Sequence, residues 1–189
     1  MLMIDNSNNN TNTNNYNYLT FFTATILEWK KLLDQDKYKK IIIESLRFLV
    51  KEERIKLCCF VIMPNHIHLV WKIDNKLNKE DVQRDFLKYT AQQIKFDLKK
   101  NHPEVLSRFY VGAKDREYQI WERNPLSVAV IRESVAQEKI IYIHNNPVRE
   151  KWNLSPDPLA YKWTSARFYE TGVDEWGFLT HYADIDYDE

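Results

Sequence analysis

The chain has 189 residues, of which 44% are hydrophobic and 14% aromatic, and this suits one domain with a buried core. No apolar run approaches the roughly 20 residues that cross a bilayer, and no basic and then apolar leader opens the chain, so we expect a cytoplasmic protein without a membrane partner. The 27 basic and 27 acidic residues balance, but residues 170–189 hold seven acids and no Lys or Arg. A net charge of +7 therefore remains on residues 1–169, which is compatible with nucleic acid but is also common in ordinary soluble proteins.

Composition divides the chain into three parts. Residues 5–17 are mostly Asn, a polar tract that cannot bury enough apolar surface to offset its ordering entropy, so we expect residues 1–17 to be disordered. Residues 18–169 carry the periodic apolar patterns of a folded domain. Residues 170–189 form an acidic C-terminal tail, for which we expect a role in solubility or, if the basic body binds nucleic acid, in limiting access to it.

The first half of the domain predicts three strands and a helix. Tyr18–Leu27 is β-branched and aromatic, which indicates a strand, and Lys37–Glu53 has an apolar stripe at helical spacing. Lys56–Met63 is a second strand, and a short Pro-Asn connection leads into a third at His66–Ile73. Cys58 and Cys59 are adjacent in the second strand and should face opposite sides, which favours packing over a disulfide.

The second half predicts two further helices and one strand. Asp81–Lys100 repeats the helical stripe after Asn78, a suitable N-cap, and residues 101–117 read as a loop. Tyr118–Glu122 is the predicted fourth strand, and Ser134–Asn145 is the predicted third helix, which ends close to a proline. A further short element is expected near residues 161–169.

The order β-α-β-β-α-β is that of the ferredoxin-like split unit. The sequence therefore predicts an α+β fold, with an antiparallel sheet, two helices packed on one face and the other face available for a ligand. In this layout the strand His66–Ile73 is central in the sheet.

Two histidines in that strand form the first candidate site. Side chains two residues apart on a strand share a face, so His66 and His68 project together. Neutral imidazoles are common ligands of divalent metals. A pair of polar residues on a solvated strand face is the alternative, and the strand alone leaves both interpretations open.

A second cluster lies in the run Tyr142-Ile143-His144-Asn145-Asn146-Pro147. Tyr142 and Asn146 are four residues apart, one helical turn, and so share a face. Mg²⁺ or Mn²⁺ requires oxygen ligands, which the Asn146 side chain can supply, and the Tyr142 phenol could attack a phosphorus atom. Packing of the Tyr142 ring on the sheet is the ordinary alternative.

Two motifs together resemble a known family. MPNHIHLVW at 63–71 and YIHNNPVR at 142–149 are similar to motifs of the HUH single-tyrosine transposases, most of all the REP-associated branch. The resemblance covers most of residues 18–170, with the motifs in the family's order. It implies a ferredoxin-like core that binds single-stranded or hairpin DNA and uses a divalent metal.

The resemblance also implies roles for particular residues. His66 and His68 would hold the metal, with Asn146 as the third, oxygen-bearing ligand. Tyr142 would attack the phosphate and leave a 5′-phosphotyrosine and a free 3′-OH. After NPVR the chain continues with Glu-Lys-Trp, where the family usually has a small-residue turn with glycine, so the exit from the helix can differ. A monomer and a homodimer, with the tyrosine acting in its own chain or in a partner's, both remain open.

Several side chains are candidate DNA contacts. Basic and aromatic residues are interleaved around Arg123 and Lys162, which we expect to contact phosphates, and Arg149 and His144 of the tyrosine run are further candidates. The neighbouring tryptophans can equally be core residues. Two other functions remain as alternatives: a domesticated, non-catalytic nucleic-acid-binding module of the same fold, and a metal-dependent hydrolase that uses an activated water and does not need Tyr142.

Overall fold

The computed structural model describes residues 18–185, so the predicted disordered segment 1–17 lies outside the described residues. The fold is α+β, with a four-stranded antiparallel sheet in the order β2-β3-β1-β6. The strands are β1 (Leu19–Thr25), β2 (Ile55–Ile62), β3 (His66–Ile73) and β6 (Leu126–Val130). The histidine strand β3 lies between β2 and β1 and is central, as predicted.

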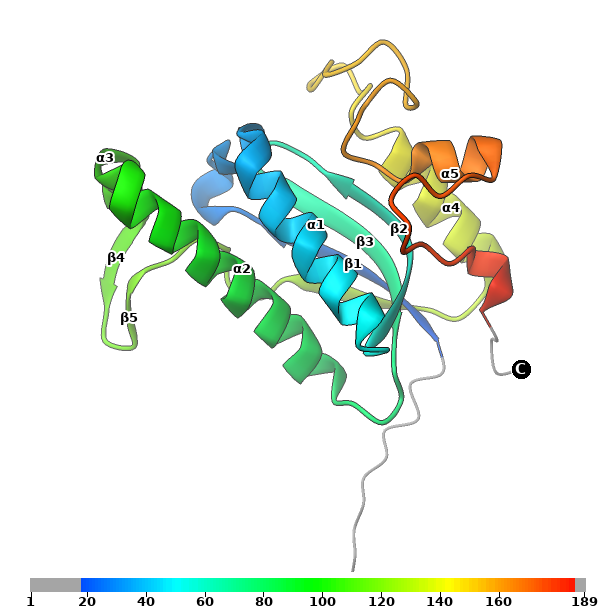
Figure 1. Ribbon diagram of the computed structural model, residues 1–189, viewed down its shortest axis with the longest axis horizontal. Helices are drawn as coiled ribbons and strands as arrows, with labels where there is room; N and C mark the ends of the chain where they lie inside the picture. Colours follow the sequence, from blue (N-terminus) through cyan, green and yellow to red (C-terminus); the bar gives the residue numbers. More distant parts are fainter. Residues whose placement is uncertain (1–17, 186–189) are drawn as a thin grey trace, which may run out of the picture.

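Two helices cover one face of the sheet, side by side in Figure 1: α1 (Asp36–Lys51) and α2 (Lys79–Asn101). They close over a core in which Trp71 packs against Phe22 and Phe86. The side chain of Asn78 accepts a hydrogen bond of 2.9 Å from the backbone N–H of Asp81, which confirms the predicted N-cap of α2.

The fourth strand was predicted in the wrong place. It is Leu126–Val130, which pairs with β1, whereas Trp121 makes only an isolated bridge with Ile26. Residues 120–122 still run beside β1, because the N–H of Glu122 donates to the carbonyl of Thr25. Residues 118–122 resemble a strand in the sequence because Trp121 is an apolar residue that is buried here. The true strand lies at the sheet edge, where the apolar side chains of Leu126 and Val128 are exposed.

The opposite face of the sheet carries α4 (Glu133–His144) and the short helix α5 (Ala166–Thr171), so it is not open throughout as predicted. The adjacent cysteines both belong to the core on this face, which corrects the prediction that they point to opposite sides. A register shift between Leu57 and Cys59 interrupts the alternation and explains the difference. Both thiols are buried and free.

The C-terminal part of the chain lies along the outer edge of β2. The N–H of Ile62 donates to the carbonyl of Trp163, and the N–H of Thr180 donates to the carbonyl of Leu57. Trp176 and Phe178 pack against Phe60. Residues 170–185 of the predicted acidic tail are thus packed on the domain and satisfy backbone groups that an edge strand would otherwise expose.

The segment predicted as a loop, residues 101–117, contains short elements of its own. These are α3 (Pro103–Leu106) and a hairpin of β4 (Tyr110–Ala113) and β5 (Arg116–Tyr118). Turns of 3-10 helix occur at Leu27–Trp29, Leu32–Asp34, Ser107–Phe109 and Tyr182–Asp184. Within residues 18–185, none of the helices combines the length and apolar character of a membrane span.

One carboxylate ties α1 to α2 and makes stability depend on pH. Burial raises the pKa of Asp97, but hydrogen bonds from Lys37, Tyr38 and Asn101 outweigh it and bring the pKa to about 2. Because this pKa lies below the unfolded value of about 3.9, the stabilisation is present above pH 4 and is lost as pH falls towards 2. Urea unfolding should show Asp97→Asn less stable than wild type at pH 6, with the gap closing by pH 2. A gap independent of pH would contradict this assignment.

Candidate active site

His66 and His68 lie side by side on the α4 face of β3, with ring centroids 4.7 Å apart, and both are buried. The Nδ1 atom of His66 lies 2.7 Å from the Oδ1 atom of Asn65, whose amide nitrogen donates to the carbonyl of Trp29. Oδ1 can only accept, so Nδ1 of His66 carries the proton. The Nδ1 atom of His68 lies 2.7 Å from the Oγ1 atom of Thr23. These bonds leave Nε2 of each ring as the atom that can coordinate a metal.

Both imidazoles are neutral at physiological pH. Burial, with a smaller contribution from Lys151, lowers the pKa of His66 to about 4, although a hydrogen bond with the Asn146 side chain opposes the shift. Burial and the neighbouring His66, with Arg149 and other cations, lower the pKa of His68 to about 3. A neutral imidazole keeps the lone pair that a metal ion requires.

Tyr142 comes from α4 and contacts His68 of its own chain. Its ring lies edge-on to His68 with the centroids 5.3 Å apart, and edge-on to Phe21 at 6.1 Å. Phe21 in turn stacks on His68 at 5.5 Å. The rings of His68 and Phe21 fix the position of Tyr142. The tyrosine is half-buried, so part of it stays accessible.

Asn146 completes the cluster. It lies just beyond the end of α4, where its N–H donates to the carbonyl of Ile143 and continues the turn. The side chain is buried and makes the hydrogen bond to His66 noted above. Tyr142, His66, His68 and Asn146 are therefore brought together from β3 and the end of α4, although they lie far apart in the sequence.

The chemistry of these donors fits a divalent metal. Two imidazoles oriented through Nδ1 and one amide oxygen make a mixed nitrogen and oxygen set. No cluster of three or more His, Cys, Asp or Glu residues suited to a metal ion occurs within residues 18–185. The side chain of Asn146, which is hydrogen-bonded to His66, is the oxygen donor beside the two imidazoles. A set without a carboxylate leaves coordination positions for ligands from outside the chain.

Three cations surround the site, each above an aromatic ring. The guanidinium of Arg149 lies 4.3 Å from the centre of the Tyr142 ring, and the ammonium of Lys139 lies 4.9 Å from that of Phe21. Lys151 lies 5.5 Å from the ring centre of Trp152, and Trp152 itself lies 5.6 Å from His66. This rim of positive charge favours binding of an anionic ligand at the surface above the tyrosine and the histidines.

The predicted DNA contacts do not gather at one place. Arg149 lies over Tyr142, as described. Arg123 lies before β6 and is 3.7 Å from Asp115, and Lys162 lies beside the opposite sheet edge with its ammonium above Trp163. His144 is buried in the core, so its side chain offers little surface to DNA.

Several residues of the site were missed in the sequence. Asn65 and Thr23 orient the histidines, Lys139 and Lys151 supply charge, and Trp152 covers His66. Lys139 precedes Tyr142 by three residues, the spacing of neighbours on one helix face, and this signal could have indicated it. Thr23 lies on another strand, and only the register of β1 against β3 brings it opposite His68.

His144 instead belongs to a buried polar cluster that fixes the end of α4. Its Nε2 atom lies 2.9 Å from the Oγ atom of Ser165, and the Sγ atom of Cys59 lies within 3.3 Å of both. The same Ser165 oxygen accepts a hydrogen bond of 3.0 Å from the N–H of Phe60. The cluster thus connects the helix that carries Tyr142 to β2 and to the C-terminal segment.

Ser165→Ala should be strongly destabilising for its size. It leaves the N–H of Phe60 and the ring of His144 without this buried partner, and each such loss costs about 1–3 kcal/mol. Chemical denaturation should show this loss, whereas Ser134→Ala, at an exposed position of α4, should change stability by less than about 0.5 kcal/mol. Equal effects of the two substitutions would refute the importance of the cluster.

Comparison with known proteins supports the fold. No family model matches the sequence, and no curated protein does so either. Among solved structures, the chain is similar to a REP-associated tyrosine transposase bound to a REP hairpin, with a TM-score of 0.60 and 17% sequence identity. The match covers 92% of each chain. The protein therefore shares the α+β fold of that transposase over nearly its whole length.

Proposed function

We propose that the protein is an HUH single-tyrosine transposase, a DNA endonuclease and strand transferase that cleaves and rejoins single-stranded or hairpin DNA. The observation that carries this proposal is the contact of Tyr142 with His68 within one chain, together with the hydrogen bond between the Asn146 side chain and His66. The fold shared with a transposase that binds a REP hairpin, and the two sequence motifs, support the same function.

In the proposed reaction the Tyr142 phenol attacks a backbone phosphorus. A bond forms from the phenolic oxygen to phosphorus as the bond from phosphorus to the 3′ oxygen breaks. The phenol loses its proton, and the departing 3′ oxygen takes one up. The products are a 5′-phosphotyrosine and a free 3′-OH. Because the new ester keeps the energy of the broken one, a later 3′-OH can attack it, rejoin the strand and restore the tyrosine.

The residues around Tyr142 have separate tasks in this proposal. His66, His68 and Asn146 would hold Mg²⁺ or Mn²⁺, which would supply charge to offset that of the phosphate. Arg149 and Lys139 attract the DNA backbone to the tyrosine. Phe21 and His68 hold the phenol ring beside the residues that would bind the metal.

The test is the formation of a covalent complex. The full chain would be incubated with Mn²⁺ and a labelled hairpin oligonucleotide that carries a single-stranded flank, and denaturing electrophoresis would separate any adduct. We expect a labelled band at the mass of protein plus DNA, and mass spectrometry of its digest should locate the nucleotide on the Tyr142 peptide. Binding without an adduct would favour the non-catalytic module instead.

A further inference from the structure

Trp29 is the most exposed tryptophan of the chain. The residue is 60% exposed, whereas the other five tryptophans, which also lie within the described residues, are buried or half-buried. An indole in this position leaves a large apolar surface in contact with water, which is unfavourable until a partner covers it. Trp29 is therefore a candidate contact for a ligand.

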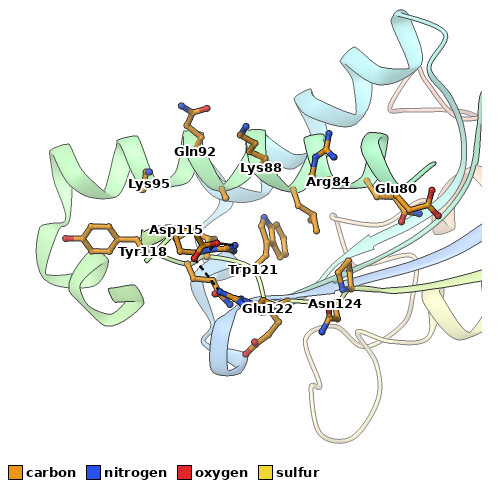
Figure 2. A pocket seen from close by; sticks show the side chains of 18 of the residues that line it. Glu80, Arg84, Lys88, Gln92, Lys95, Asp115, Tyr118, Trp121, Glu122 and Asn124 are labelled. Atoms are coloured by element: carbon orange, nitrogen blue, oxygen red, sulfur yellow. Dashed lines mark hydrogen bonds and ion pairs between the residues drawn. The ribbon is translucent and has the colours of Figure 1, made fainter. Parts of the chain in front are cut away.

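The backbone around Trp29 is held in an unfavourable conformation. Glu28 and Trp29 have φ angles of 55° and 58°, in the left-handed region that residues other than glycine rarely adopt. The N–H of Glu28 donates to the Oε1 atom of Glu122 at 2.6 Å, and the carbonyl of Trp29 accepts from the side-chain amide of Asn65 at 2.9 Å. Figure 2 shows the Glu122 carboxylate pointing away from α2, beside the groove between that helix and residues 115–127. Hydrogen bonds on two sides thus fix the turn that presents the indole.

The indole lies next to the histidine pair. Its ring centroid is 6.2 Å from that of His66, and the Asn65 side chain that holds the Trp29 carbonyl also orients His66. From Trp29 the next rings are His66, His68 and Tyr142, with 4.7 Å between the two histidines and 5.3 Å from His68 to the tyrosine. Because β1 pairs with β3 here and leads directly into the turn of Trp29, the indole and the phenol lie towards opposite ends of the histidine pair.

The surroundings of Trp29 suit an unpaired nucleic-acid strand. Sites for such strands combine aromatic rings, on which bases stack, with cations that neutralise the backbone. Lys31 is exposed two residues after Trp29, and Lys151 lies above the Trp152 ring beside His66. Trp152 itself is half-buried, with its ring against His66 and Lys151. Of the two indoles next to His66, Trp29 is therefore the one with enough free surface to take a base.

We infer that the Trp29 indole stacks on an unpaired base next to the phosphate that Tyr142 attacks, an inference that rests on the proposed function. A strand whose phosphate lies over the histidines extends from the phenol end of the pair to the indole end, and its base at the indole end meets Trp29. Stacking holds this nucleotide and keeps the phosphate beside the tyrosine. Since every base has a π-face, the contact is independent of which base is present.

A double-mutant cycle between protein and DNA tests the inference. Tyr142→Phe, and the double variant Tyr142→Phe, Trp29→Ala, would bind DNA without covalent reaction. Fluorescence anisotropy would measure their affinity for a labelled hairpin with a single-stranded flank, and for a series of the same DNA with one abasic residue at each flank position. Loss of the indole should weaken binding of the intact DNA about tenfold. At one abasic position the two proteins should bind equally, because the base and the indole act as a pair, and at the other positions the difference should remain.

Two further variants in the Tyr142→Phe background separate stacking from structure. Trp29→Tyr keeps an aromatic ring and should restore most of the affinity. Phe96→Ala removes another exposed aromatic ring, from α2 on the opposite side of the sheet, and should leave the affinity unchanged. The inference is overturned if Trp29→Ala binds the intact DNA as tightly as its parent, or if the tenfold difference persists at every abasic position.

The inference and the proposed function can fail separately. If the wild-type chain forms the covalent adduct while Trp29→Ala leaves DNA affinity unchanged, the inference fails and the proposed function stands. If Trp29 is coupled to one base but the wild-type chain forms no adduct, the proposed function fails, and Trp29 is then a base contact of a non-catalytic binding module.

Discussion

Tyr142→Phe is expected to abolish the covalent complex with hairpin DNA. The substitution removes the oxygen that would form the phosphate ester, while the ring can keep its contacts with His68, Phe21 and Arg149. We therefore expect unchanged folding and DNA affinity, with adduct formation reduced by at least about 10³-fold, as for loss of a catalytic nucleophile. Denaturing electrophoresis of the labelled complex measures the effect.

A second tyrosine gives the matched control. Tyr89 lies on α2, is 51% exposed and is remote from the histidine face, so Tyr89→Phe should form the adduct at the wild-type rate. Cleavage that survives Tyr142→Phe would overturn the tyrosine mechanism in favour of a hydrolase with an activated water. An adduct that survives would place the nucleophile on another residue.

The double variant His66→Ala, His68→Ala is expected to lose divalent metal binding. Substitution of residues that merely orient metal ligands costs 10–100-fold in affinity, so loss of two direct ligands should weaken Mn²⁺ binding by more than about 100-fold. Isothermal titration with Mn²⁺ measures this without reference to DNA cleavage. The amount of covalent protein–DNA adduct formed in the presence of Mn²⁺ should fall together with the Mn²⁺ affinity.

His102 supplies the control for this variant. It lies at the end of α2, outside the cluster, so His102→Ala should bind Mn²⁺ with wild-type affinity. Thermal unfolding checks that the double variant is folded, which is expected because both histidines are neutral and no charge is left unpaired. Wild-type Mn²⁺ affinity in the double variant would exclude these imidazoles as the ligands.

Much of the sheet could be predicted because its residues carry local signals. The bounds of β3 were predicted without error from β-branched and aromatic residues between turn residues, and Asn78 was a correct N-cap. The fourth strand was misplaced because Ile120 and Trp121 are buried although they are not in a strand, whereas the apolar side chains of Leu126–Val130 are largely exposed. Position at the edge of a sheet is a property of the tertiary fold.

The candidate site was predictable in part for the same reason. His66 and His68 share a strand face, and Tyr142 and Asn146 share a helical turn, so both pairs follow from local spacing. That α4 lies on the histidine face depends on long-range packing, and the second motif alone did not determine it. Thr23 carries no motif at all, and only strand register identifies it.

The attachment of the C-terminal segment to β2 has a consequence for any shortened form of the protein. A chain ended at residue 169, where the acidic character begins, would uncover Phe60 and lose the carbonyl of Trp176, which accepts a hydrogen bond from Arg47. The edge of the strand next to the histidines would then lose the N–H of Thr180 that donates to the Leu57 carbonyl, together with its apolar cover. Truncation at that point would therefore invite self-association, and the acidic stretch up to residue 185 is part of the minimal folding unit.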